Sequence, residues 1–173
     1  MKKGFRSLLV LGLMTLLLPG IAVGGPVEEV DAVVNRWIAA FNANDVNALV
    51  KNYAPDATFV GTVGTTLGEG SDAIRHYYAR LKGTGDSVDI RERKTVMLCD
   101  EVAYVSGIYE FHVARNGKER STPDRFTMIL IKRGSDWEIT HHHSSRSPNV
   151  SPVRVRRAIE FEHDFASLSE PTE

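Results

Sequence analysis

The sequence predicts an α+β fold in which three helices precede a four-stranded antiparallel meander. Two observations support this prediction. In the first half of the chain, apolar residues recur at intervals of three and four, as on one face of an amphipathic helix. After Gly85 the interval falls to two, as in strands with one buried face. We expect helices packed on one face of the sheet, which must curl around them to bury its apolar side.

The first 24 residues are typical of a secretory signal peptide. Lys2, Lys3 and Arg6 form a basic start, Leu8–Leu18 is an apolar run, and Ala22–Gly24 supplies the small residues of a cleavage site. The apolar run is shorter than the roughly 20 residues that span a bilayer. We therefore expect a periplasmic or secreted mature chain without membrane contact after cleavage.

The first predicted helix covers Val27 to Phe41 and carries its apolar residues at helical spacing. Asp45 caps a second helix that reaches about Tyr53, and a turn at Pro55 leads into a brief strand. This strand covers Ala57 to Val60. A glycine-rich hinge, residues 61–70, has neither GK[ST] nor GxGxxG spacing and is not a phosphate loop. Ser71 caps a third helix through Leu81.

Four longer strands follow, each with alternating apolar residues. Their turns fall at dipeptides typical of hairpins, among them Asn116-Gly117 and Gly134-Ser135. The predicted strands are Ser87–Cys99, Glu101–Ala114, Arg120–Arg133 and Trp137–Ser145.

Length and charge limit the number of domains and the kinds of partner that fit the chain. The chain has 173 residues with 21 basic and 22 acidic side chains, and three of the basic ones lie in the signal peptide. The remainder is acidic overall, which argues against nucleic acid as a partner. The single cysteine, Cys99, allows no intrachain disulfide. We expect one domain over residues 25–148 and a tail, residues 149–173, that could form a short helix.

Two stretches of the sequence carry a family resemblance. "VVNRWIAAFNANDVNALVKNYAPDATF", followed by "GSDAIRHYYARL", resembles the opening of the SnoaL-like, or nuclear transport factor 2-like, superfamily, which includes ketosteroid isomerases. "STPDRFTMILIKRGSDWEITHHHSSRSP" resembles the closing strands of the calcium/calmodulin-dependent protein kinase II association domain and its bacterial relatives. The resemblance implies a cystatin-like α+β cone, with three N-terminal helices on a strongly curved, mostly antiparallel sheet around a deep pocket. It also implies a homodimer or larger homo-oligomer.

Steroid isomerisation does not transfer along with the fold. In the isomerases that the chain resembles, a carboxylate base moves a proton while a tyrosine and a protonated aspartic acid donate hydrogen bonds to the oxyanion. The matching motifs place Trp37 at the tyrosine and Gly61 at the base, and only Asp124 keeps its counterpart. Because Gly61 has no side chain to act as a base, we expect no standard ketosteroid isomerase.

The run "ITHHHSSRSP" supplies the candidate acid–base residues. Strict alternation along the last strand places His141 and His143 on one face, together with Trp137 and Ile139. Zinc would need a third ligand, which no fixed spacing provides, so we expect no metal and no other cofactor. His143 or His141, oriented by Asp124, could instead transfer a proton to a bound molecule.

Arg125 is a charged residue in an otherwise apolar strand. It either forms a buried ion pair that fixes strand register or holds a ligand carboxylate at the pocket wall. Of the adjacent residues Tyr77 and Tyr78, we expect at most one to reach the pocket, because they point about 100° apart on a helix. The predicted ligand-binding residues are Trp37, Phe41, Phe59, Tyr77, Tyr104, Arg125, His141 and His143.

Three functions are compatible with these features. The first is a self-associating pocket protein for a small ligand that is apolar or carries a carboxylate. The second is a cofactor-free enzyme of isomerase or cyclase type, in which a pocket histidine works with Asp124. The third is an oligomerisation module similar to the kinase association domain.

Overall fold

The computed structural model describes residues 24–115 and 118–148. The described residues exclude 1–23 of the predicted signal peptide, the predicted turn at 116–117 and the predicted tail at 149–173. The elements are α1 (Pro26–Asn42), α2 (Val46–Val50), β1 (Tyr53–Val60), β2 (Gly68–Glu69), α3 (Gly70–Tyr78), the 3₁₀ turn η1 (Ala79–Leu81), β3 (Ser87–Cys99), β4 (Val102–Arg115), β5 (Lys118–Arg133) and β6 (Asp136–Arg146).

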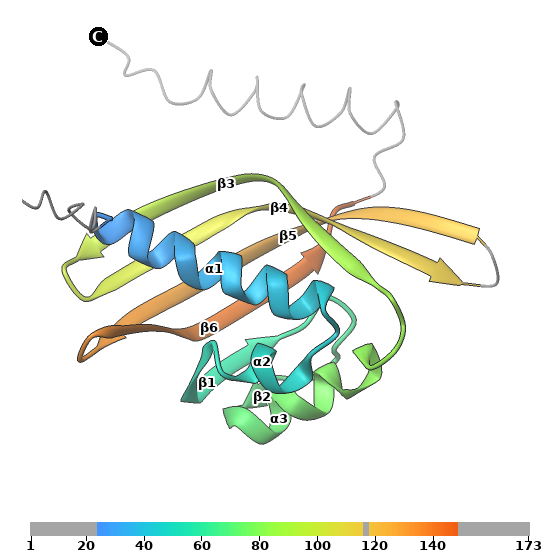
Figure 1. Cartoon of the computed structure of the whole chain (residues 1–173), viewed down its shortest axis with the longest axis horizontal. Coiled ribbons are helices and arrows are strands. Elements are labelled where there is room, and N and C mark those ends of the chain that lie inside the picture. The colour runs from blue at the N-terminus through green and yellow to red at the C-terminus, as the bar shows by residue number, and fades with distance from the viewer. Residues whose placement is uncertain (1–23, 116–117, 149–173) are drawn as a thin grey trace, which may run out of the picture.

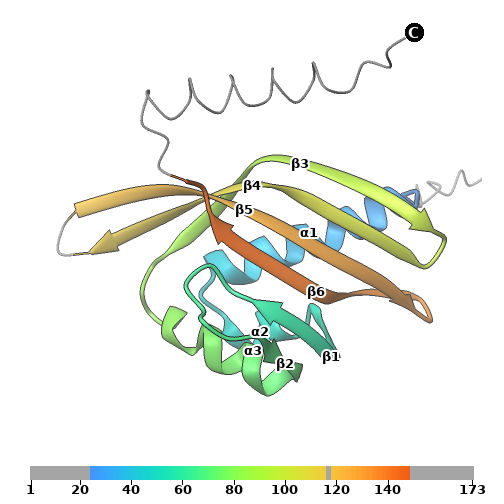
Figure 2. The same cartoon turned by 180° about the vertical axis from the view of Figure 1, so that it is seen from behind.

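Six strands within the described ranges form one curled sheet in the order β2-β1-β6-β5-β4-β3. The pairing of β1 with β6 is parallel, and the other neighbours are antiparallel. Figure 1 shows α1 lying across one face, with α2 and α3 gathered near β1. Seen from behind in Figure 2, the opposite face of β3 to β6 is covered by none of the described helices. The predicted arrangement of three helices on a curved sheet is confirmed.

The α1 helix forms where the helical spacing predicts it. Its apolar stripe is buried against the sheet, with Val30, Val34 and Trp37 at most 1% exposed. The helix ends after Asn42, and Asn44 adopts a positive φ of 53° while its side-chain amide donates to the Phe41 carbonyl. This turn fixes the position of α2, which begins after the predicted cap: Asp45 accepts from the Ala48 amide at 3.0 Å.

Two predictions about the next segment are wrong. The second helix ends at Val50 rather than near Tyr53, and β1 runs through Pro55 instead of starting after a turn there. Proline lacks an N–H group, so it fits only where no ladder hydrogen bond is needed. Pro55 meets this condition, because β2 pairs with β1 only at Thr58 and Phe59, and the β1–β6 register is interrupted between Tyr53 and Thr58.

The glycine-rich segment also differs from the prediction. Its last residues form β2, and α3 begins at Gly70, so Ser71 lies inside the helix rather than capping it. Gly70 has a φ of +78°, which glycine adopts without steric cost. No described helix is long and apolar enough to cross a membrane.

The core lies between α1 and the concave face of the sheet. The strands contribute Ala103, Val105, Met128, Leu130 and Ile139, all at 0% exposure. Toward the other end of the same face, aromatic and polar residues replace the aliphatic ones, and the interior opens into a cavity.

Candidate functional site

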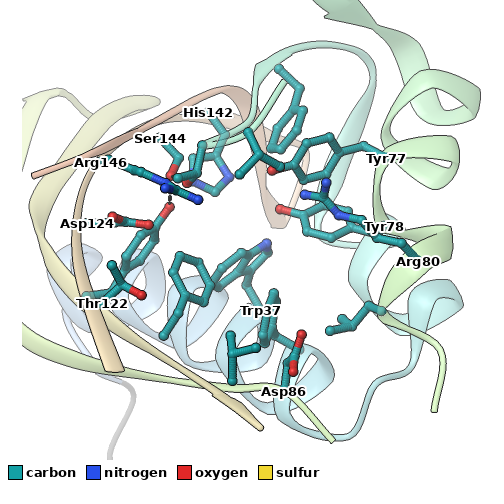
Figure 3. A pocket seen from close by; sticks show the side chains of 18 residues that line it. Trp37, Tyr77, Tyr78, Arg80, Asp86, Thr122, Asp124, His142, Ser144 and Arg146 are labelled. Carbon is teal, nitrogen blue, oxygen red and sulfur yellow. Dashed lines mark hydrogen bonds between the residues drawn. The ribbon is translucent and has the colours of Figure 1, made fainter. Parts of the chain in front are cut away.

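A cavity of about 340 Å³ lies between α1, α3, η1 and the concave face of the sheet. This volume is at the lower end of the range for small-molecule sites. Figure 3 shows Tyr77, Tyr78 and Arg80 on one side, Asp124 and Arg146 on the other, and His142 across from Trp37. Seven aromatic residues contribute to the lining: Trp37, Phe41, Phe59, Tyr77, Tyr78, Tyr109 and Phe111.

The aromatic walls are packed against one another. Trp37 and Tyr109 lie nearly parallel, 9° apart with ring centroids separated by 6.1 Å, and Tyr109 continues the stack onto Phe126 at 4.8 Å. Tyr77 meets Phe59 edge to face at 4.6 Å. Rings held in this way offer flat apolar surface and lose little conformational freedom when a ligand binds.

A buried hydrogen-bond network surrounds the hydroxyl of Tyr53. Nε1 of Trp37 donates to Tyr53 Oη at 2.9 Å, and Tyr78 Oη lies 3.1 Å away. The same oxygen lies 2.8 Å from Nδ1 of His142. Burial raises the pKa of both tyrosines far above the ordinary value, so both hydroxyls stay protonated. The network therefore joins α1, β1, α3 and β6 behind the cavity.

His142 is an uncharged histidine in this wall. It is 1% exposed and packed between the rings of Trp37, Tyr53 and Phe59. Loss of hydration lowers the pKa of His142 to about 3, with smaller contributions from the neighbouring His141 and His143. Its Nε2 atom is buried and has no hydrogen-bond partner within the described part of the chain.

Asp124 supplies a carboxyl group at the other side of the cavity. It is 3% exposed, and its Oδ1 has no hydrogen-bond partner among residues 24–115 and 118–148. Desolvation raises the pKa of Asp124, while the charge of Arg146 and the backbone amide of Ser147 act in the opposite direction. Next to it, Tyr109 donates to Ser144, which also bonds Thr62.

The structure brings together five of the residues predicted to form the site. Trp37, Phe41, Phe59 and Tyr77 line the cavity, as does Asp124. Tyr78 lines it as well, so the expectation that only one of the adjacent tyrosines reaches the cavity is wrong. The helix ends at Tyr78, and the cavity is wide enough to meet both rings.

His141 and His143 do not border the cavity, and the prediction that they do is wrong. Trp137 and Ile139 point inward as expected, but Leu130 pairs with Ile139 while the adjacent Ile129 pairs with His141. Thr140 is thus an extra residue, a β-bulge, and it shifts the alternation by one position. Beyond it, His142 and Ser144 face inward.

The two outward-facing histidines have other surroundings. His141 Nδ1 lies 2.7 Å from Thr58 Oγ1, and desolvation, followed by the nearby His143, lowers the pKa of His141. His143 is exposed. Neither lies among the residues that line the cavity with Asp124.

Arg125 and Tyr104 also lie outside the cavity, contrary to the prediction. Arg125 is exposed on the outer face, where it donates to the carbonyl oxygen of Arg146 at 3.1 Å. Neither expected role, a buried ion pair or a carboxylate clamp in the pocket, fits this position. Tyr104 is half-buried on the same outer face, opposite Ile129.

The position that would hold the isomerase base is filled by another residue. A Cβ atom built on Gly61 would lie 2.2 Å from a ring carbon of Tyr77. The Tyr77 ring occupies the space that a carboxylate side chain at position 61 would need. This contact supports the prediction that standard steroid isomerisation does not transfer.

Several residues that form the site were missed by sequence reasoning. Tyr109 could have been found, because it alternates with the inward-facing Ala103 and Val105 on β4. His142 and Ser144 could not, because Thr140 is an ordinary strand residue and nothing in it signals a bulge. Among the described residues, no cluster of three or more His, Cys, Asp or Glu could hold a metal ion.

Comparison with known proteins shows which family model and which solved structures the chain resembles. Residues 30–149 match the family model described as a SnoaL-like domain. A Xanthomonas campestris structure assigned as a calcium/calmodulin-dependent protein kinase II association domain is 30% identical, with a TM-score of 0.66 over 70% of this chain and 88% of that one. A Novosphingobium aromaticivorans protein described as NTF2-like with a cystatin-like fold is 14% identical, with a TM-score of 0.62 over 74% of this chain and 86% of that one.

A steroid Δ-isomerase from Nocardioides simplex is 37% identical over 62 residues, which make up 36% of this chain and 50% of that protein. The chain thus matches about half the length of this relative. The predicted cystatin-like cone is confirmed by the fold of the solved structures. Because the family model covers most of the sequence and all the residues that line the cavity, the chain belongs to the SnoaL-like domain family.

Proposed function

We propose that the chain is a periplasmic or secreted protein that binds a small, mainly apolar molecule in the cavity. One observation carries the proposal: His142 Nε2 and Asp124 Oδ1 are buried polar atoms without partners in the described ranges, and both residues line an aromatic cavity. An unsatisfied buried polar group costs about 1–3 kcal/mol. A ligand with polar atoms at these points would recover that cost.

The lining favours a ligand with a flat apolar body and a polar end. Seven of the 18 lining residues are aromatic, whereas only four are Asp or Arg. Arg146 lies beside Asp124, and Arg80 lies over the Tyr77 ring at 4.2 Å. Both arginines are exposed, so a carboxylate on the ligand could pair with them while its apolar part stays buried. The periplasmic or secreted location is inferred from the signal-peptide pattern of residues 1–24.

The fluorescent probe 8-anilinonaphthalene-1-sulfonate tests the proposal. It should bind the protein with enhanced emission, and Val113→Trp, which places an indole in the cavity lining, should weaken that binding at least about tenfold. Leu98→Trp adds the same indole at an exposed position of β3 away from the cavity and should bind the probe like the unmodified chain. Equal binding by both variants would contradict a ligand site in the cavity.

Acid–base catalysis is a second candidate function, favoured by Asp124. A buried carboxyl with a raised pKa and an unpartnered oxygen can exchange a proton with a ligand. The similarity to a steroid Δ-isomerase supports an isomerase-type reaction. Binding alone is better supported, because a pKa of about 3 makes His142 a poor proton acceptor at neutral pH. Asp124 would therefore work without a histidine base.

Self-association through the outer face of the sheet is the further part of the proposal. A row of side chains crosses four strands there, in the paired order Val96, Tyr104, Ile129 and His141. All four are half-buried, and Ile108 and Ile131 extend the apolar surface. A second copy of the chain would cover this face. The similarity to a structure assigned as an association domain supports such pairing.

A further inference from the structure

The hydroxyl of Tyr53 has one proton and three hydrogen-bonding neighbours, of which two can accept that proton. The indole N–H of Trp37 can only donate, so Tyr53 Oη must accept that bond at 2.9 Å. The proton of Tyr53 is then available either to Nδ1 of His142 at 2.8 Å or to Tyr78 Oη at 3.1 Å. The choice decides which nitrogen of the neutral His142 ring carries a proton.

In the first arrangement Tyr53 donates to His142, whose Nδ1 accepts and whose Nε2 therefore carries the proton. Tyr78 then donates to Tyr53, so the hydroxyl protons of both tyrosines are used. Only Nε2–H of His142 is left without a partner in the described part of the chain.

In the second arrangement His142 donates from Nδ1 and Tyr53 donates to Tyr78. The hydroxyl proton of the buried Tyr78 then has no acceptor among the described residues, and Nε2 of His142 is an unpaired acceptor. Two buried groups are left unsatisfied instead of one. Since each such group carries a cost, the first arrangement is the more stable.

We infer that Tyr53 fixes His142 as the Nε2–H tautomer, so that the cavity selects ligands that bring a hydrogen-bond acceptor to this point. The inference rests on the proposed ligand site and adds the chemistry that His142 recognises. Nδ1 is turned toward Tyr53, so Nε2 lies on the opposite edge of the ring. A carbonyl or ether oxygen matches this donor, whereas an ammonium or other pure donor does not. Tyr53 is a positioning residue, because it acts on the ligand only through His142.

Nitrogen-15 NMR of the histidine rings tests the tautomer without any ligand. In the labelled protein at pH 7, His142 should show an unprotonated Nδ1 and a protonated Nε2, assigned by the loss of these signals in His142→Asn. Tyr53→Phe removes the hydroxyl donor, and the two ring signals should then move toward each other as both tautomers become populated. Tyr77→Phe removes a neighbouring hydroxyl that has no bond to His142 and should leave the signals in place.

A pair of probes tests the selection of an acceptor. The ketone 2-acetylnaphthalene and its alkene isostere 2-isopropenylnaphthalene differ only in an oxygen that replaces a methylene group. In displacement of 8-anilinonaphthalene-1-sulfonate, the ketone should bind about threefold to tenfold more tightly than the alkene. His142→Phe should abolish this preference, and His76→Phe, which replaces an exposed histidine outside the cavity lining, should keep it.

These results separate the inference from the proposed function. A protonated Nδ1, unchanged ring signals in Tyr53→Phe, or equal binding of ketone and alkene would each overturn the inference while leaving a ligand site intact. Loss of all probe binding, with the predicted tautomer observed, would overturn the ligand site and its selectivity together. The tautomer is measured on the unmodified chain, and only the assignment of its signals uses His142→Asn. If that variant fails to fold, the His142 ring is assigned through its nuclear Overhauser contacts to the rings of Trp37 and Phe59.

Discussion

At the scale of single residues, burial decides what His142 can do. A histidine in water is half protonated near pH 6.5, but packing among aromatic rings lowers the pKa of this side chain to about 3. His142 therefore stays neutral throughout the physiological range and serves as a fixed hydrogen-bonding group. His143, one position further along, is exposed to solvent. One bulge residue thus decides which imidazole is buried.

The lowered pKa of His142 predicts that the protein loses stability in mild acid. Below pH 6.5 the unfolded chain binds a proton at this residue and the folded chain does not, so the free energy of unfolding falls with decreasing pH until about pH 3. The slope from this residue approaches about 1.4 kcal/mol per pH unit. Urea denaturation between pH 7 and pH 5 should show a smaller slope in His142→Asn.

His143→Asn is the matched control, because it removes an exposed histidine from the same strand. It should retain the pH dependence of the unmodified chain. Asp124, with a raised pKa, and His141, with a lowered one, are present in all three chains, so their contributions cancel in the comparison. A slope in His142→Asn equal to that of the unmodified chain would show that His142 is not buried in its neutral form.

At the scale of elements, two irregularities of the sheet have separate effects. The bulge at Thr140 selects the face of β6, and a second register shift between Ile90 and Glu92 of β3 brings its backbone over Gly107 of β4. A Cβ atom at Gly107 would lie 2.1 Å from the Glu92 carbonyl oxygen and 2.9 Å from the Arg93 Cα. Because both contacts are to backbone, a side-chain rotation cannot relieve them.

Gly107→Ala should therefore destabilise the fold strongly. The added methyl group forces β3 away from β4, and we expect the free energy of unfolding to fall by about 3 kcal/mol, near the upper end for overpacking. Ser106→Ala changes the neighbouring residue of β4 without adding volume and should cost less than about 1 kcal/mol. Chemical denaturation of both variants measures the difference, and a Gly107→Ala variant as stable as Ser106→Ala would show that β3 does not press on this glycine.

Irregular pairing of β1 and β6 explains how much could be predicted from the sequence. The helical spacing of Val30, Val34 and Trp37 depends only on which face is buried, so α1 was predicted closely. The extent of β1 and the face of β6 depend on pairing with strands distant in the sequence. The neighbouring strands allow Pro55 to lie within a strand and Thr140 to form a bulge. The local residue pattern does not indicate which strands these neighbours are. The site was therefore predicted on its helices and misplaced on its last strand.

At the scale of the whole molecule, the sheet has two faces with different roles. The concave face holds the core and the cavity, and the outer face presents half-buried apolar side chains that none of the described helices covers. Ile129 lies in the middle of this outer row, between Tyr104 and His141. Self-association would bury the outer face without closing the cavity.

Ile129→Lys should weaken self-association by placing a charge in the middle of the outer face. Sedimentation equilibrium at micromolar concentration should show a dimer or larger assembly for the unmodified chain and a shift toward monomer for the variant. Leu67→Lys alters an apolar residue that is 63% exposed elsewhere and should leave the mass unchanged. A monomeric unmodified chain would exclude the proposed assembly, and binding of the fluorescent probe by Ile129→Lys would show that the cavity survives.

The parallel pairing of β1 with β6 has a consequence for how the protein is made. The strand that carries His142 and Ser144 inserts between β1 and β5, although it is translated after both. A nascent chain can form α1 and the β3–β4 hairpin early, but the β6 side of its cavity, with His142 and Ser144, is missing until that strand leaves the ribosome and docks. Contacts between such distant segments form slowly, so we expect the capacity to bind a ligand to be the last property the chain acquires during folding.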